Sequence, residues 1–231
     1  MAAKPTNRII SFSGIDGAGK SSQIHALEIC LAEAGLHVST LTMWDDVVVG
    51  AHFRETASRR AFRGDQGIGT PENPLHRRDK NVSSWPLTLV RCFFYFLDGM
   101  SLLMTVRRMR RKVHHDVIIF DRYIYDELAN LPLNNRFARS FMRLLLRIVP
   151  KPEIAFLVDA EPEAARARKP EYPVEFLRRN RQAYLALREF APDIVLVHCG
   201  SAEDMERAIR INLRSRLEIN ASGSLLEPSR Q

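Results

Sequence analysis

The sequence is poor in cysteine. Its 231 residues contain three, Cys30, Cys92 and Cys199, which are far apart and odd in number. They form no C-x-x-C pair, so the sequence indicates neither a disulfide framework nor a zinc site, and a reducing cytosol fits. Residues 1–7 are polar and lack the apolar core of a signal peptide. We therefore expect a cytoplasmic protein.

A long hydrophobic run free of charge is also missing. The most apolar stretch, residues 86–106, contains Arg91 and Asp98, and a charge at a bilayer centre costs about 3 kcal/mol. Because these two residues lie seven apart, they return to nearly the same face of a helix, which predicts one polar stripe on an otherwise buried helix. We expect no membrane insertion, and we interpret residues 85–106 as a core helix or a homodimer interface.

The overall composition is that of a globular chain with a basic balance. Hydrophobic residues make up 45% and charged residues 26%, so one domain over residues 1–219 can bury a core, followed by a loose tail at 220–231. The net charge of +7 suits an anionic ligand, and no nucleic-acid partner is expected. The basic run 107–112 either ends a helix, where the dipole favours cations, or contacts an acidic partner or a membrane surface.

Short β-branched and aromatic runs alternate with stretches of helical periodicity. Strands are expected at residues 8–13, 37–43, 116–120, 153–158 and 194–198. Helices are expected at residues 22–34, around 51–62, and at 86–106, 134–149, 161–168, 174–191 and 201–217, with a loop at 64–84. This alternation predicts an α/β fold with a doubly wound, parallel, five-stranded sheet flanked by helices, of the P-loop NTPase type.

A phosphate-binding loop follows the first expected strand. Residues 14–21 read G-I-D-G-A-G-K-S, which satisfies G-x-x-x-x-G-K-[ST], and a helix follows. Glycines let backbone N–H groups and the helix N-terminus converge on phosphate oxygens. Lys20 would reach the β- and γ-phosphates, and the Ser21 hydroxyl would bind Mg²⁺. The motif predicts binding of a nucleoside triphosphate through Gly14, Asp16, Gly17, Ala18, Gly19, Lys20, Ser21 and Ser22.

A second polar site is expected where the third strand ends. Asp121 lies at its carboxyl end, beside the first strand, where ligands bind in open α/β sheets. A carboxylate there can hold Mg²⁺ or its water shell, and a helix cap is the alternative. Arg122 follows, and its planar guanidinium suits a phosphate, with an ordinary surface salt bridge as the alternative.

Four motifs carry a resemblance to a known family: G-I-D-G-A-G-K-S-S-Q (14–23), D-R-Y (121–123), K-P-E (151–153) and L-V-D (157–159). In order and spacing they resemble thymidylate kinases, least closely over residues 44–87. The resemblance implies a P-loop kinase that uses ATP and Mg²⁺. It also implies a nucleoside monophosphate as the acceptor, with dTMP converted to dTDP.

The resemblance further implies roles for individual residues. Asp16 would approach the sugar and phosphate of the acceptor, and Arg122 would hold the acceptor phosphate. A short lid over residues 161–173 would bring arginines over the transferring phosphate, and Arg166 and Arg168 lie in that segment. A solvated basic helix is the alternative interpretation of these two. Together with Lys20, these residues form the expected catalytic set.

The acceptor side departs from the family pattern. Thymidylate kinases carry an Asp-Arg pair on the long helix, whereas this sequence has Asp98-Gly99, and Arg91 lies two helical turns earlier. After the second strand the sequence has Asp45 and Asp46, which resemble the general-base carboxylates of nucleoside kinases; turn or cap chemistry is the alternative. The residues expected to bind the acceptor are Asp45, Arg91, Tyr95, Asp98, Arg122 and Tyr123.

Two other functions stay open at this point. One is a kinase of the same fold that acts on a nucleoside, a sugar or another hydroxyl compound, with Asp45 or Asp46 as its base. The other is a nucleotide-binding regulatory ATPase. Turnover that depends strictly on an acceptor would identify a kinase, with either a monophosphate or a hydroxyl acceptor, whereas turnover without an acceptor would identify the ATPase.

Overall fold

Five parallel strands form one sheet in the computed structural model, which describes residues 7–48, 85–111 and 115–217. The strands are β1 (Arg8–Ser13), β2 (Val38–Thr42), β3 (Val117–Asp121), β4 (Ile154–Asp159) and β5 (Val195–His198). Their order is β2-β3-β1-β4-β5. The five expected strands are confirmed to within a residue at each end. The helix expected around residues 51–62, the loop at 64–84 and the tail at 220–231 lie outside the described residues.

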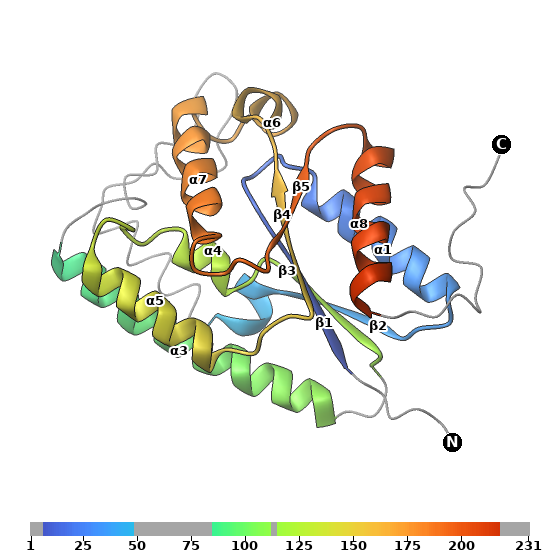
Figure 1. Cartoon of the computed structure of the whole chain (residues 1–231), viewed down its shortest axis with the longest axis horizontal. Coiled ribbons are helices and arrows are strands. Elements are labelled where there is room, and N and C mark those ends of the chain that lie inside the picture. The colour runs from blue at the N-terminus through green and yellow to red at the C-terminus, as the bar shows by residue number, and fades with distance from the viewer. Residues whose placement is uncertain (1–6, 49–84, 112–114, 218–231) are drawn as a thin grey trace.

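Helices cover both faces of this sheet. They are α1 (Lys20–Glu33), α3 (Trp85–Arg111), α4 (Ile124–Leu128), α5 (Arg136–Ile148), α6 (Pro162–Arg168), α7 (Val174–Leu187) and α8 (Ala202–Leu217). Figure 1 shows α1 and α8 on one side of the sheet and α3 and α5 on the other. The doubly wound α/β fold is therefore confirmed.

The central strands are buried because both faces of the sheet are covered. β1, β3 and β4 consist almost wholly of buried residues, and in β3 and β4 all of them but the final aspartate are apolar, as expected of strands in a parallel sheet. Phe12 on β1 packs its ring against Phe156 on β4, with centroids 5.1 Å apart. In the register of the sheet Phe12 also lies opposite Asp121 on β3. This register brings the carboxyl ends of β1 and β3 to the same edge, where both expected polar sites lie.

Two short elements were not predicted from the sequence. A π-helical turn, η1 (Met43–Val47), follows β2 and is closed by a hydrogen bond of 2.9 Å from Val48 N to Met43 O. The helix α4 follows β3 directly and spans five residues. Both are too short to show a helical period. Each lies at the carboxyl end of its strand, so both belong to the polar edge of the sheet.

The orientation of α3 differs from the prediction. The polar stripe was expected on an otherwise buried helix, yet Asp98 is fully buried, Arg91 is half-buried, and several large apolar side chains face solvent. The reason is that the inner face of α3 packs against α4, α5 and η1, where polar groups have partners. Among the described residues, α3 is the one helix with the length and hydropathy of a membrane span, and 33% of its apolar window is buried.

Candidate active site

The phosphate-binding loop joins β1 to α1 and packs tightly against the fourth strand and the helix after it. Gly14 has φ +140°, and a Cβ there would overlap the carbonyl oxygen of Val158 on β4. Gly17 has φ +80°, and a Cβ there would overlap the carbonyl oxygen of Ala165 on α6. L-residues with a side chain rarely adopt these backbone angles. Glycine at these two positions therefore lets the loop lie directly on its neighbours.

Lys20 is the first residue of α1, and its side chain is buried under the loop. Its ammonium donates hydrogen bonds of 2.9 Å to the carbonyl oxygens of Gly14 and Ile15. Burial, and after it the nearby Arg122 guanidinium, lowers the pKa of Lys20 to about 8, although the aspartates around it act in the opposite direction. The structure thus places a cation inside the loop, as the sequence predicted.

Arg122 lies between two carboxylates at the end of β3. Its guanidinium pairs with Asp16 of the phosphate-binding loop and, at 3.1 Å, with Asp126 of α4. Its backbone has φ +68°, the left-handed region that non-glycine residues seldom occupy, and its N–H donates to Phe12 O at 2.9 Å. Such a conformation is retained only where its surroundings hold it, and such positions cluster at functional sites.

Asp126 is the centre of a buried network that the sequence analysis missed. One carboxylate oxygen accepts from Ser13 Oγ at 2.6 Å and from Tyr123 N at 3.0 Å. The other accepts from Arg122 and, at 2.7 Å, from the Tyr184 hydroxyl on α7. The signal that was available is its place three residues after Tyr123: Asp126 is the third residue of α4, and its carboxylate accepts from Tyr123 N as a helix cap. Asp126 fixes the direction of the Arg122 side chain.

The charges of this network reinforce one another. Burial alone would lower the pKa of Arg122, but the carboxylates of Asp126 and Asp16 outweigh it and raise that pKa, so the guanidinium stays charged. Burial also raises the pKa of Tyr184 well above its usual value, and the charge of Asp126 adds to the effect. The Tyr184 hydroxyl therefore keeps its proton and donates a hydrogen bond to Asp126.

Asp121 and Ser21 are the two residues that the sequence predicts to hold a metal ion. Asp121 ends β3 and is half-buried, close enough to Lys20 and Arg122 for its charge to act on the pKa of both. Ser21 lies exposed in the first turn of α1. Among the described residues no three His, Cys, Asp or Glu side chains come together as a metal cluster. These two oxygen donors fit Mg²⁺, which usually binds through one or two side chains together with water and substrate phosphates.

One face of α7 links the lid segment to the Arg122 network. Arg178 pairs with Glu163 of α6, and Arg181 donates to both oxygens of Asp159, at 2.6 and 3.0 Å. Tyr184, three residues further along the helix, reaches Asp126. Residues three apart lie on one helix face, so α7 contacts the lid, β4 and α4 together. Figure 1 shows α6 at the end of the sheet where β1 leads into α1.

Two lid arginines lie at different depths. Arg168 is exposed, and its guanidinium donates to Ala164 O at 3.2 Å and to the Cys199 thiol at 3.1 Å. One of its nitrogens lies 3.6 Å from the Cβ position built on Gly19, so it reaches the phosphate-binding loop. Arg166 is half-buried, and its Nε has no hydrogen-bond partner in the described part of the chain.

The two aspartates after β2 have different surroundings. Both lie exposed on η1. Asp46 accepts a hydrogen bond of 2.6 Å from Thr42 N, which is the turn chemistry considered as its alternative role. Asp45 accepts no hydrogen bond from the residues that the structure describes. Of the two, Asp45 is the one with a carboxylate available to a ligand.

The α3 residues expected to bind the acceptor lie beside η1 and α4. Arg91 donates to Asn130 O at 3.4 Å, and Tyr95 and Asp98 are buried further along the same face. Ser101 Oγ donates to Val47 O at 2.6 Å and ties α3 to η1. The part of α3 that faces inward therefore borders the aspartates of η1.

Two positions on the acceptor side face away from the site. Tyr123 was expected to bind the acceptor, but its ring is fully buried in the core and its hydroxyl donates to Pro150 O at 2.5 Å. Gly99 occupies the position of the family's acceptor arginine, yet a Cβ there would lie 2.7 Å from Leu145 Cδ1 on α5. Position 99 faces α5, and because glycine has no side chain there, α3 and α5 can approach closely. Neither position is therefore able to bind the acceptor.

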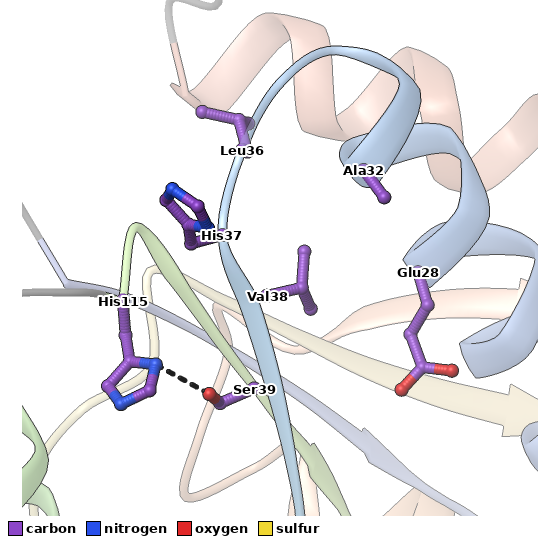
Figure 2. Close-up of a pocket in the computed structure, with 7 residues that line it drawn as sticks. All are labelled: Glu28, Ala32, Leu36, His37, Val38, Ser39 and His115. Atoms are coloured by element: carbon purple, nitrogen blue, oxygen red, sulfur yellow. Dashed lines mark hydrogen bonds between the residues drawn. The ribbon is translucent and has the colours of Figure 1, made fainter.

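An open hollow of about 500 Å³ lies at the other end of β2, away from these residues (Figure 2). It is lined by Glu28, Ala32, Leu36, His37, Val38, Ser39 and His115. Ser39 Oγ and His115 Nδ1 are 2.6 Å apart, and Glu28 extends from α1 on the opposite side of β2. These residues belong to the amino end of β2, whereas the phosphate-binding loop lies at the carboxyl ends of the strands.

The chain was compared with known proteins, and no protein-family model matches it. It is similar to proteins named probable thymidylate kinase in three archaea. The one from Archaeoglobus fulgidus is 23% identical over 225 residues, 94% of this chain and 100% of the relative. The one from Methanopyrus kandleri is 27% identical over 203 residues, 86% of this chain and 84% of the relative. The one from Methanosphaera stadtmanae is 22% identical over 200 residues, 85% of this chain and 91% of the relative.

These similarities agree with the class that the fold defines. A five-stranded parallel sheet flanked by helices, with the phosphate-binding loop after β1, is consistent with a P-loop kinase such as thymidylate kinase. The similarity to the Archaeoglobus fulgidus protein covers 94% of this chain and the whole of the relative.

Proposed function

We propose that the chain is an ATP-dependent phosphotransferase that transfers the γ-phosphate of ATP to dTMP and releases ADP and dTDP. The observation that carries this proposal is the proximity of a buried cation, Lys20, and a partly buried one, Arg122, at the carboxyl ends of β1 and β3. The names of the archaeal relatives support dTMP as the acceptor.

The two cations bind different substrates: Lys20 binds ATP and Arg122 binds the acceptor. Lys20 and the backbone N–H groups of the loop bind the β- and γ-phosphates and neutralise the charge that develops on them. Arg122 exchanges part of its contact with Asp16 for the acceptor phosphate, and Asp16 is then able to accept a sugar hydroxyl. An acceptor phosphate oxygen bonds to the γ-phosphorus while the bond to the β–γ bridging oxygen breaks. No general base is needed, because that oxygen is already ionised near neutral pH.

Ser21 and Asp121 would hold Mg²⁺, directly or through water. When bound, Mg²⁺ would offset the negative charge of the triphosphate. In the lid, Arg168 reaches the phosphate-binding loop, which supports a contact between this arginine and the transferring phosphate. Arg166 is the second lid arginine of the proposed catalytic set.

A coupled assay of ADP release with Mg-ATP tests the acceptor. The panel contains dTMP, dUMP, the other nucleoside monophosphates, thymidine and simple sugars, and ATP alone serves as the blank. Turnover with dTMP well above the rest supports the proposal. ADP release that is independent of any acceptor would instead identify a regulatory ATPase.

A hydroxyl acceptor is the second candidate, and the surroundings of Asp45 favour it. Asp45 is exposed on η1, which contacts α3, and accepts no hydrogen bond from the described residues, whereas Asp46 accepts one from Thr42 N. If activity appears only with thymidine or a sugar, Asp45→Asn should lower kcat roughly 10²–10⁴-fold. The matched variant Asp46→Asn should then have a much smaller effect.

A further inference from the structure

The contacts around the phosphate-binding loop form a closed ring, and α7 carries one side of it. Figure 1 shows one end of α7 beside α6 and the other end beside α4, and α7 contacts both helices. Three of its residues, Arg178, Arg181 and Tyr184, make the polar contacts of this side, and their spacing of three places them along one side of the helix. α7 therefore joins the lid segment to the network around Asp126.

The lid end of α7 is held by carboxylates of the lid segment. Arg178 pairs with Glu163 of α6. Arg181 donates a hydrogen bond of 2.7 Å to Glu161, the residue before α6. The Arg181 guanidinium also donates to both oxygens of the buried Asp159 at the end of β4, which raises the pKa of Arg181 and keeps it charged. Arg181 is therefore fixed on the sheet and holds the lid segment to it.

The other end of α7 is held by Tyr184. This residue is buried, and its hydroxyl donates to the Asp126 oxygen that also accepts from Arg122. The second Asp126 oxygen accepts from Ser13, the residue directly before the phosphate-binding loop. One carboxylate thus receives α7, Arg122 and the end of β1. A shift of α7 would move the oxygen that directs the Arg122 side chain.

The ring closes at Gly17 of the phosphate-binding loop. A Cβ at this position would overlap the carbonyl oxygen of Ala165, so the loop and α6 are packed together. Phosphates bound in the loop would hold α6 in place, and α6 would hold α7 through the pairs described above. Both substrates of the proposed reaction therefore touch the same ring, ATP at the loop and the acceptor phosphate at Arg122.

We propose that Tyr184 is a positioning residue for Arg122, and that through it α7 makes the acceptor bind more tightly when ATP occupies the phosphate-binding loop. The proposal rests on the proposed function, in which Arg122 binds the acceptor phosphate. ATP holds α6 and α7 in one arrangement, and Tyr184 then fixes Asp126 and the guanidinium beside it before the acceptor arrives. A group that is already in place loses less freedom on binding, so affinity rises. Linkage requires the reciprocal effect, tighter binding of ATP when the acceptor is present.

Calorimetric titration of the full chain with dTMP tests the proposal, with and without a saturating non-hydrolysable ATP analogue and Mg²⁺. The analogue should lower the Kd of dTMP at least about fivefold, the lower end of the usual coupling between two sites. Tyr184→Phe should remove most of this enhancement and change the Kd of the analogue alone little. Tyr125→Phe is the matched control, because it removes another buried tyrosine hydroxyl, from α4, and should keep the enhancement.

Glu161→Gln tests the lid end of the same link. It weakens the contact of the lid segment with Arg181 and should also reduce the enhancement. Glu175→Gln is its control, because Glu175 is exposed and its pairs with Arg178 and Arg179 lie within α7, so the enhancement should persist. Thermal unfolding of each variant confirms that it is folded.

The outcomes separate the coupling from the proposed function. If Tyr184 is merely structural, Tyr184→Phe lowers stability and leaves the enhancement unchanged, and this result overturns the proposal. An equal loss in Tyr125→Phe or Glu175→Gln does the same, and so does a wild-type Kd of dTMP that the analogue leaves unchanged. In each of these results dTMP still binds, so only the coupling is rejected. No binding of dTMP under either condition rejects the proposed function and the coupling with it.

Discussion

Gly17 of the phosphate-binding loop lies directly against the carbonyl oxygen of Ala165 on α6, with no space for a Cβ between them. The loop and the first helix of the lid are therefore one packed unit. Arg178 and Arg181 hold the same lid segment to α7, through Glu163 and Glu161. The position of the lid is coupled in this way to the geometry of the phosphate-binding loop.

Gly17→Ala should lower the free energy of unfolding by more than the cost of its left-handed backbone, because the new methyl group would also overlap α6. Gly35 provides the matched control, because it has φ +76° and nothing within 4 Å of its Cβ position. Gly35→Ala should lower the free energy of unfolding by about 1 kcal/mol, the usual cost of left-handed backbone in a residue with a side chain. Gly17→Ala should lower it further and weaken ATP binding, because α6 must move. Urea unfolding and ATP titration measure both. Equal effects of the two variants would contradict the packing.

Lys20 should reduce stability at neutral pH. Burial lowers its folded-state pKa from 10.5 to about 8, so between these values the unfolded chain binds more protons, and stability rises with pH across that window. The rise should be about 3 kcal/mol at most. Lys20→Met should lack it and be more stable than wild type at pH 7. Urea unfolding at pH 7 to 10.5 measures the difference, and parallel curves for the two proteins would refute it.

The same lowered pKa should appear in the pH dependence of activity. If the Lys20 ammonium binds the phosphates, kcat/KM for ATP should fall as pH rises through about 8, since the neutral amine binds them poorly. Lys20→Arg, which keeps its charge, should lower activity but lose this fall. A pH profile of kcat/KM for both proteins decides it, and an identical fall in the arginine variant would assign the titration to another group.

The sequence was most informative where a pattern is local. The phosphate-binding loop, the five strands and the position of Asp121 follow from motif spacing and from continuous apolar runs, and the structure places them accordingly. The Asp126 network was missed because its members, Ser13, Arg122 and Tyr184, come from distant segments that only the fold brings together.

Side-chain direction was the second limit of the sequence. Tyr123 directly follows Arg122, but the left-handed backbone of Arg122 separates the two directions, so one side chain faces the site and the other the core. Gly99 has no side chain to reveal that its position faces α5. A linear motif gives the order of residues but not the direction in which each points.

Asp126→Asn should destabilise the chain more than Tyr184→Phe, which removes a single hydrogen bond to the same carboxylate. The variant removes the charge that holds a partly buried guanidinium and should lower the free energy of unfolding by about 3 kcal/mol. Tyr184→Phe removes one bond to the same carboxylate and should lower it by about 1 kcal/mol. Thermal unfolding compares them, and KM for the acceptor should rise in Asp126→Asn. A larger effect from Tyr184→Phe would place the centre of the network elsewhere.

Asp121→Asn should raise the Mg²⁺ concentration needed for half-maximal activity by roughly tenfold or more, because a charged oxygen donor is lost. Asp45→Asn is the matched control, since it lies at the carboxyl end of the neighbouring strand and is not proposed to hold the metal. A Mg²⁺ titration at saturating ATP measures the shift. An unchanged midpoint in Asp121→Asn would remove this residue from the metal site.

The most direct test of the account is the transfer of label from γ-labelled ATP to dTMP, followed in wild type and in Lys20→Ala. The account predicts labelled dTDP with the wild-type chain and a loss of at least roughly 10²–10³-fold in the variant, as expected when a group that stabilises the transition state is removed. Retention of the full transfer rate in folded Lys20→Ala would contradict the account, as would the absence of label in dTDP from the wild-type chain.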